Sequence, residues 1–346
     1  MNTFEIKRQI AARVIQEEKN ISSDSQSETC GRDWFGMDFS RPWLRHYPEE
    51  VASSYEYPRH NLAKFLINSA NKLPHNPAVY FMGKKNELQP AAFRFIPVCQ
   101  RTAWIRYHKG RQGGDHASQL PPSVIAYFGS LLMGAVVVQT NPLYMEGELK
   151  QQLEDSGAVA MVTLDALCPR VLKVQPHTSL RTLIITSVQD YLPFPKNWVN
   201  TLTQKKAGIV PKVEYGNGVL AFAKFLSEAS TAPICAEVVA EKDLAVLQYT
   251  GGTTGVSKGV MLTHYNLTAN TVQNAHWSYK GRFGKERYLA ALPCFHVFGL
   301  TVCLQQCVYN GGMLILIPRF EVKSVLKTID KLRPLCFREL RRCISR

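Results

Sequence analysis

The sequence predicts an α/β fold whose sheets are mostly parallel and carry helices on both faces. From residue 121 to residue 333, short apolar runs of strand length alternate with segments whose apolar residues recur at helical spacing. Strands separated by helices need crossover connections, and such connections join parallel neighbours. The composition agrees, because 45% hydrophobic and 20% charged residues are ordinary for a soluble globular protein. A chain of 346 residues can bury a substantial core in two or three subdomains.

The first expected helix spans residues 62–73, where apolar side chains recur at helical spacing and Asn61 can cap the N-terminal end. A strand is expected at 77–82, with a turn at Gly83. Residues 1–40 combine an amphipathic beginning with a run rich in serine and aspartate, and we interpret them as a mobile extension.

Residues 117–145 contain no charge and could be interpreted as a membrane span. Their apolar core is shorter than the roughly 20 residues that a spanning helix needs. Gly134 also separates a helix-like half from a half rich in β-branched residues. We therefore expect a buried helix at 123–134 and a buried strand at 135–139.

The remaining elements alternate regularly up to residue 329. The helix expected at 146–155 places Leu149 and Leu153 on one inward face, because residues four apart share a face of a helix. The other expected strands are 159–164, 183–187, 288–292 and 313–317, and the other expected helices are 264–274 (capped by Thr263), 298–309 and a last one with Val322, Val325, Leu326 and Ile329 on one face.

A loop rich in glycine and threonine follows a predicted buried strand at 244–249. Its glycines let consecutive amides point into one concavity, its threonine hydroxyls add donors, and Lys258 adds a positive charge, which suits a polyphosphate. The common phosphate loop opens directly into a helix, whereas here a second short strand is expected at 259–262. The anion would therefore be held by a turn between strands. The alternative is a flexible hairpin loop with a surface lysine.

The net charge of +14 is concentrated in two segments, because residues 89–118 and 332–346 each carry a net charge of +4. This distribution does not indicate nucleic-acid binding, which spreads basic residues over one face. Nine cysteines without C-x-x-C pairs argue against a disulfide framework and a zinc site. The N-terminus lacks the pattern of a signal peptide, so we expect reduced thiols and a cytoplasmic protein.

Residues 89–118 show neither a helical nor a strand period and mix charge with glycine. One interpretation is a basic surface loop. The other is that this stretch has lost an ancestral reading frame.

Three segments of the chain carry distinctive motifs. Residues 141–149 are Asn-Pro-Leu-Tyr-Met-Glu-Gly-Glu-Leu, residues 249–259 are Tyr-Thr-Gly-Gly-Thr-Thr-Gly-Val-Ser-Lys-Gly, and residues 292–300 are Leu-Pro-Cys-Phe-His-Val-Phe-Gly-Leu. In this order and spacing they resemble the motifs of the AMP-forming acyl-CoA synthetases, an adenylate-forming family. The first motif and Arg-Pro-Trp at 41–43 are typical of its bacterial long-chain-fatty-acid–CoA ligase branch.

The resemblance implies doubly wound sheets of an N-terminal AMP-binding (adenylation) domain, here partial and spanning 41–333, with 89–118 atypical. Residues 1–40 would be an extension and residues 334–346 a tail outside the family pattern, with the family's C-terminal lid domain absent. Ser257 and Met145 stand where proline and threonine are usual. The basic, pattern-free tail leads us to expect a frameshifted, truncated chain.

The resemblance also implies the reaction. A fatty-acid carboxylate attacks the α-phosphate of ATP to give acyl-AMP and pyrophosphate, and the thiol of coenzyme A then displaces AMP. Lys258 and Thr253 would be the catalytic contacts, and Thr250 would bind Mg²⁺. The implied ATP-binding residues are Thr250, Gly251, Gly252, Thr253, Thr254, Gly255 and Lys258, and those on the acyl side are His296, Val297 and Gly299.

The expected function is thus a long-chain fatty acid–CoA ligase that is inactive or severely impaired as this chain, since the ribose-binding aspartate and C-terminal lysine of the family are missing. The alternative is a non-catalytic remnant that binds acyl chains or anionic membranes. The expected partners are a long-chain fatty acid, ATP and coenzyme A, with no nucleic acid and at most peripheral contact with the inner membrane face. His264 and His276 are interpreted as structural.

Overall fold

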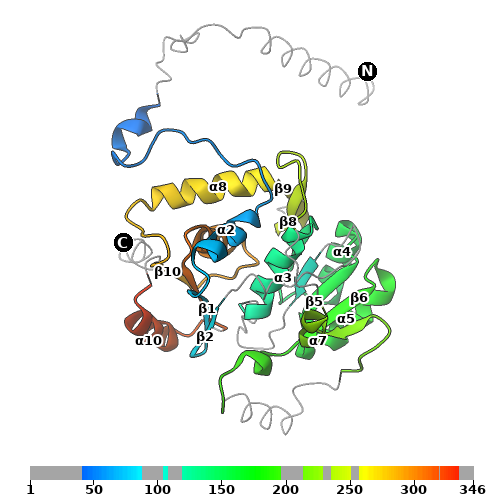
Figure 1. The fold of residues 1–346 in the computed structure, drawn as a ribbon. Coiled ribbons are helices and arrows are strands. Elements are labelled where there is room, and N and C mark those ends of the chain that lie inside the picture. The colour runs from blue at the N-terminus through cyan, green and yellow to red at the C-terminus, as the bar shows by residue number, and fades with distance from the viewer. Residues whose placement is uncertain are drawn as a thin grey trace, which may run out of the picture. The chain divides into compact units, whose positions relative to one another are not determined.

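The computed structural model describes residues 41–87, 104–107, 119–195, 213–228, 235–250, 257–318 and 320–334. Predictions for residues 1–40, for most of 89–118 and for 335–346 lie outside these ranges. The chain divides into two compact units, Met1–Ser54 and Tyr55–Arg346. In the first unit, residues Pro42–His46 form the 3-10 helix η1. The second unit contains two β-sheets (Figure 1).

The larger sheet has the strand order β7-β6-β5-β3-β4-β8-β9. These strands are β3 (Trp104–Tyr107), β4 (Val137–Gln139), β5 (Ala160–Leu164), β6 (Thr182–Thr186), β7 (Val219–Ala221), β8 (Leu244–Thr250) and β9 (Lys258–Thr263). All neighbours are parallel except β8 and β9, which are antiparallel. The predicted parallel arrangement with crossover connections is therefore confirmed.

Strand β3 lies inside this sheet, between β4 and β5. Its four residues belong to the segment 89–118, for which a basic surface loop was one interpretation. That interpretation is wrong for Trp104–Tyr107, because the backbone of this strand pairs with a neighbour on each side. A strand of four residues flanked by charge and glycine is too short to show a period in the sequence.

The smaller sheet has the strand order β10-β11-β1-β2. Its strands are β1 (Pro77–Phe81), β2 (Lys84–Glu87), β10 (Arg287–Ala290) and β11 (Met313–Leu316). β1 and β10 pair parallel with β11, whereas β1 and β2 form an antiparallel hairpin. The predicted turn at Gly83 makes this hairpin, with a φ of +105° that favours glycine.

Helices cover both faces of both sheets. They are α2 (Lys64–Lys72), α3 (Pro121–Leu132), α4 (Glu146–Ser156), α5 (Cys168–Val174), α7 (Phe222–Ser227), α8 (His264–Trp277), the π-helix η6 (Gly299–Gln305), α9 (Gln306–Tyr309) and α10 (Val322–Leu332). Helix α3 lies between the sheets (Figure 1), because its Leu131 belongs to one core cluster with Phe81 of β1 and Val138 of β4.

Each sheet also packs in a second, smaller cluster. Ile184 of β6 packs in a second cluster with Phe222 of α7, whereas its neighbours Leu183 and Ile185 belong to the main cluster. Val325 of α10 joins a third cluster, on the outer face of the smaller sheet. Alternating strand residues thus face helices on opposite sides, which is the predicted layered α/β fold.

The uncharged stretch 117–145 forms α3 and β4, as predicted. Helix α3 has 12 residues, and ten of them are buried. No helix within the described ranges has the length and apolar character needed to cross a membrane.

One local prediction needs correction. Asn61 does not cap the first helix, which begins at Lys64. Its Oδ1 accepts from the amide of Ala63 and its Nδ2 donates to the carbonyl of Leu131, so this buried side chain joins the start of α2 to α3. The helix predicted at 298–309 is present, and its residues Gly299–Gln305 form the π-helix η6. Such π-helical turns within α-helices are uncommon and often lie at functional sites.

Candidate functional site

The glycine-rich loop connects two antiparallel strands, as the sequence predicted. β8 ends at Thr250, β9 begins at Lys258, and these two residues are register partners. Both are exposed, so a hydroxyl and an ammonium group stand at the two ends of the loop. Five predicted ligand-binding residues lie outside the described ranges, and their roles stay predictions: Gly251, Gly252, Thr253, Thr254 and Gly255.

Tyr249 anchors this hairpin to α4. The Tyr249 hydroxyl donates to Oδ2 of Asp155 at 2.5 Å. Burial, followed by the hydrogen bond and charge of Asp155, raises the pKa of Tyr249, so the phenol keeps the proton that it donates. Its ring lies directly against Gly259, where an added Cβ would stand 3.0 Å from the ring. The start of strand β9 is therefore held against the ring of Tyr249.

We expect Tyr249→Phe to lower the free energy of unfolding by about 1–2 kcal/mol, because it removes a hydrogen bond to a charged acceptor. Tyr265→Phe is the matched control, since among the described residues no hydrogen bond of the Tyr265 hydroxyl is seen and only its ring packs against Tyr57. Urea denaturation of both variants measures the difference. Equal free energies for the two variants would show that the Asp155 contact contributes nothing.

Gln248 joins the same strand to the segment 292–300. Its Nε2 donates to the carbonyl of Phe295 at 2.9 Å. Gln248 is only 7% exposed, so this hydrogen bond lies inside the protein. Gln139 of β4 is the register partner of Gln248 and is also buried. Buried polar side chains are retained where they make specific contacts, and here the contact sets the distance between β8 and the His296 segment.

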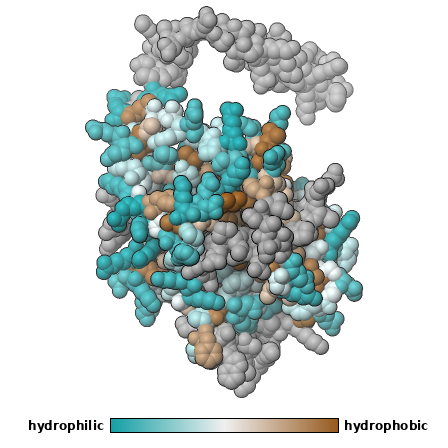
Figure 2. All heavy atoms as spheres, viewed as in Figure 1, coloured by the Kyte–Doolittle hydropathy of each residue, from teal (hydrophilic) through white to brown (hydrophobic). Residues whose placement is uncertain are grey.

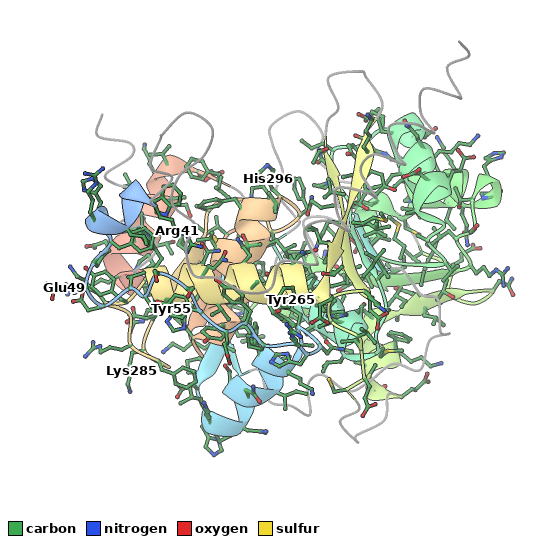
Figure 3. All side chains as sticks on the ribbon, turned by 90° about the horizontal axis from the view of Figure 1, so that it is seen from above. Arg41, Glu49, Tyr55, Tyr265, Lys285 and His296 are labelled. Atoms are coloured by element: carbon green, nitrogen blue, oxygen red, sulfur yellow. The ribbon has the colours of Figure 1, made fainter. Side chains whose placement is uncertain are left out.

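The three residues predicted for the acyl side lie at the beginning of η6. His296 and Val297 are exposed, and Figure 3 shows His296 next to the start of this helix. Gly299 is buried, and an added Cβ would lie 2.3 Å from the carbonyl oxygen of Pro293. Gly299 is thus required by the close approach of the backbone, which holds His296 and Val297 in place.

Gln119 fixes the start of this segment. Its Nε2 donates to the carbonyl of Leu292 at 2.7 Å, and its Oε1 accepts from the amide of Ile317 at 3.4 Å. One buried amide therefore ties together the chain beyond β10 and the chain beyond β11.

The three sequence motifs meet at the carboxyl end of β8. Tyr249 reaches Asp155 beside the first motif, and Gln248 reaches Phe295 in the third. In open α/β sheets, ligands bind beyond the carboxyl ends of the strands. The exposed Thr250 and Lys258 at this end can hold an anionic phosphate by a hydroxyl and a charge-assisted hydrogen bond.

Sequence reasoning did not assign roles to Gln248, Tyr249, Asp155 or Gln119. The signal available for Gln248 was a lone amide inside an otherwise apolar strand, a pattern that predicts a specific buried contact. Asp155 could not be recognised as the partner of Tyr249 from local pattern, because the two residues lie 94 positions apart.

A glycine- and threonine-rich sequence between two strands of a mostly parallel, helix-covered sheet is typical of nucleotide-binding α/β proteins. Residues 98–338 match the family described as AMP-binding enzyme, and the chain belongs to this family. The match begins within the segment 89–118 that the sequence pattern left unassigned, and it includes β3.

Named relatives make the comparison more specific. The chain is 39% identical over 306 residues to the long-chain-fatty-acid–CoA ligase of Bacillus subtilis, covering 87% of this chain and 54% of the relative. The corresponding ligase of Salmonella typhimurium is 34% identical over 300 residues, covering 84% and 52%. The chain spans about half the length of these curated relatives. A crystal structure of a long-chain-fatty-acid-CoA ligase from Archaeoglobus fulgidus shares the fold, with a TM-score of 0.63, 21% identity, and coverage of 83% of this chain and 53% of that one.

Proposed function

We propose that this chain carries the nucleotide- and acyl-binding part of a long-chain fatty acid–CoA ligase. The observation that carries the proposal is the convergence of the three motifs, through Tyr249–Asp155 and Gln248–Phe295, at the end of β8. The names of the relatives from Bacillus subtilis and Salmonella typhimurium support this substrate class. The reaction would activate a fatty acid with ATP as acyl-AMP and then transfer the acyl group to coenzyme A, in the cytoplasm.

No enzyme nucleophile is needed in this reaction, so catalysis would rest on positioning and on charge. Lys258 would place a cation beside the departing phosphates, and the hydroxyls and amides of the loop would bind their oxygens. Asp155 and Tyr249 would hold the hairpin so that Thr250 and Lys258 stay at the edge of the sheet. His296 and Val297, exposed at the start of η6, would contact the acyl substrate.

Mg²⁺ fits this site through Thr250, whose exposed position at the end of β8 offers a hard hydroxyl oxygen. Within the described ranges no group of three His, Cys, Asp or Glu side chains is positioned to hold a metal ion. Oxygens of the bound phosphates would therefore complete the coordination. The ion would neutralise phosphate charge.

Binding of ATP tests the proposal. With ATP and Mg²⁺ at about one hundred times the dissociation constant, the folded chain should gain about 2.7 kcal/mol of stability. Lys258→Ala should weaken binding by roughly 10- to 100-fold, because it removes a charge-assisted hydrogen bond. Urea denaturation with and without ATP and Mg²⁺ measures the gain in stability, and isothermal titration calorimetry measures the affinity of the unaltered chain and of Lys258→Ala.

Lys242→Ala is the matched control, since Lys242 is also exposed but precedes the opposite end of β8. Binding that is equally weakened in the two variants would contradict a specific role for Lys258. Absence of ATP binding by the folded chain would overturn the proposed site. If ATP does bind, isotope exchange between ATP and pyrophosphate in the presence of palmitate would measure the first half-reaction.

A further inference from the structure

The segment between α8 and β10 exposes aromatic and cationic side chains together. Trp277 is 51% exposed and Phe283 is 47% exposed. Three cations lie between or beside them and are exposed as well: Lys280, Arg282 and Lys285. We propose that residues 277–285, which we call the aromatic–cationic turn, dock on an anionic lipid surface.

The charge of this region is one-sided. From residue 266 to residue 290 the sequence contains four cations and a single acid, Glu286. The Glu286 carboxylate accepts a hydrogen bond from the amide of Arg282, so it serves the turn itself. None of the ion pairs among the described residues uses Lys280, Arg282 or Lys285. Their charge remains available to an anionic surface, and Figure 3 shows Lys285 at the edge of the molecule.

The aromatic side chains are accompanied by cations. The ammonium group of Lys72 lies 5.4 Å from the ring centre of Phe283, and that of Lys280 lies 5.3 Å from the ring centre of Tyr279. Tryptophan, tyrosine and lysine in such proximity are typical of protein surfaces at the membrane–water boundary, where rings enter the headgroup layer and ammonium groups contact phosphates. On the face shown in Figure 2, hydrophobic residues form only small patches among hydrophilic ones.

The turn is held in one conformation by the fold beneath it. The Gly284 amide donates to the carbonyl of Asn310 at 2.8 Å, and Asn76 Nδ2 donates to the carbonyl of Gly284 at 3.1 Å. Gly284 has a φ of +74°, and an added Cβ would lie 2.7 Å from Leu73. A preorganised surface loses little conformational entropy when it binds, so exposed rings on it can be used for docking.

Lipid is favoured over a nucleic acid because a nucleic-acid site would be a groove, with rings stacked along it, and no pocket among those described includes this turn. The docking surface is separate from the proposed ATP site, so each can fail without the other.

Co-sedimentation with vesicles tests the inference. The chain should bind vesicles of phosphatidylcholine that contain about 30% phosphatidylglycerol, because anionic lipids attract basic segments. It should bind vesicles of pure phosphatidylcholine only weakly. The triple variant Lys280→Gln, Arg282→Gln, Lys285→Gln should lose about 100-fold in partitioning, at roughly fivefold per cation. The double variant Trp277→Ala, Phe283→Ala should also lose at least roughly tenfold.

The control carries the same loss of charge elsewhere: Lys84→Gln, Lys85→Gln, Lys242→Gln, at three exposed lysines outside the turn. The inference is supported if only the variants of the turn lose binding while all variants keep their circular dichroism spectra. It is overturned if the control loses as much as the turn variants, if binding ignores lipid charge, or if the wild-type chain does not bind. Should Trp277→Ala fail to fold, Trp277→Phe must keep vesicle binding but abolish the blue shift of fluorescence on docking.

Discussion

Gly299→Ala is expected to lower the free energy of unfolding by about 3 kcal/mol and to reduce acyl binding with it. An added Cβ at this position would lie 2.3 Å and 2.7 Å from the carbonyl oxygen and carbon of Pro293, and 3.0 Å from the oxygen of Leu292. All three are backbone atoms, which cannot move aside as a flexible side chain can. Overpacking of this kind costs about 1–3 kcal/mol, and rigid neighbours place the variant at the upper end.

Gly129→Ala is the matched control for this variant. Gly129 lies in α3, and an added Cβ there would meet no atom within 4 Å. Because alanine favours the helix over glycine by about 1 kcal/mol, this variant should be neutral or more stable. Urea denaturation of the two variants should therefore give changes of opposite sign or very different size. Similar destabilisation by both would disprove the steric argument.

The stability of the chain is expected to rise by about 3 kcal/mol between pH 4 and pH 6.5 through His264 alone. His264 is fully buried, and its Nδ1 accepts from the amide of Leu62 at 3.1 Å, which requires the unprotonated nitrogen. Burial lowers the pKa of His264 to about 4, although the charge of Asp243 opposes this shift and His60 adds to it.

The sign follows from proton binding. At pH values between the pKa of about 4 in the folded chain and the ordinary value of 6.5, His264 is protonated in the unfolded chain but not in the folded chain. Stability from this group is therefore complete above pH 6.5 and is lost as the pH falls towards 4. The gap corresponds to about 3 kcal/mol, at about 1.4 kcal/mol for each pH unit.

His264→Asn is the informative variant, because its Oδ1 can still accept from Leu62 while the side chain does not titrate. Denaturation curves from pH 4 to pH 7 should show a flatter pH dependence for this variant than for the unaltered chain. The difference between the two proteins removes the contributions of Asp165 and Asp190, whose pKa values are raised by burial. His177→Asn, at an exposed position, controls for the loss of a histidine; if it flattens the curve equally, the assignment to His264 is wrong.

Much of the second unit could be predicted from local patterns. The apolar stretch 117–145 indicated α3 followed by β4, and Thr263 indicated the cap of α8, where its Oγ1 accepts from the amide of Asn266. The strand, loop and strand around 250–258 were also predicted, since β8 and β9 flank the loop. These features depend on neighbours in sequence, and local backbone preferences are sufficient to specify them.

In the last helix, α10, apolar spacing did not predict which residues are buried. The four apolar residues predicted for one face of α10 recur at helical spacing, yet Val325 is 3% exposed whereas Val322 and Leu326 are 63% and 57% exposed. Val325, Ile329 and Leu332 pack against the smaller sheet, whereas Val322 and Leu326 do not belong to this cluster. Spacing identifies a helix and its apolar side, but the width of the contact depends on what lies opposite.

The sequence by itself determined the family, the alternation of strands and helices, and the hairpin that carries Thr250 and Lys258. The tertiary structure alone decided that β3 pairs with both β4 and β5, that Gln248 reaches Phe295, and that Tyr249 reaches Asp155 across 94 residues. It also decided that Gly299 is required by the backbone of Pro293. Hydrophobic periodicity is a property of neighbouring residues, whereas strand order and contacts between distant side chains depend on how the whole chain packs.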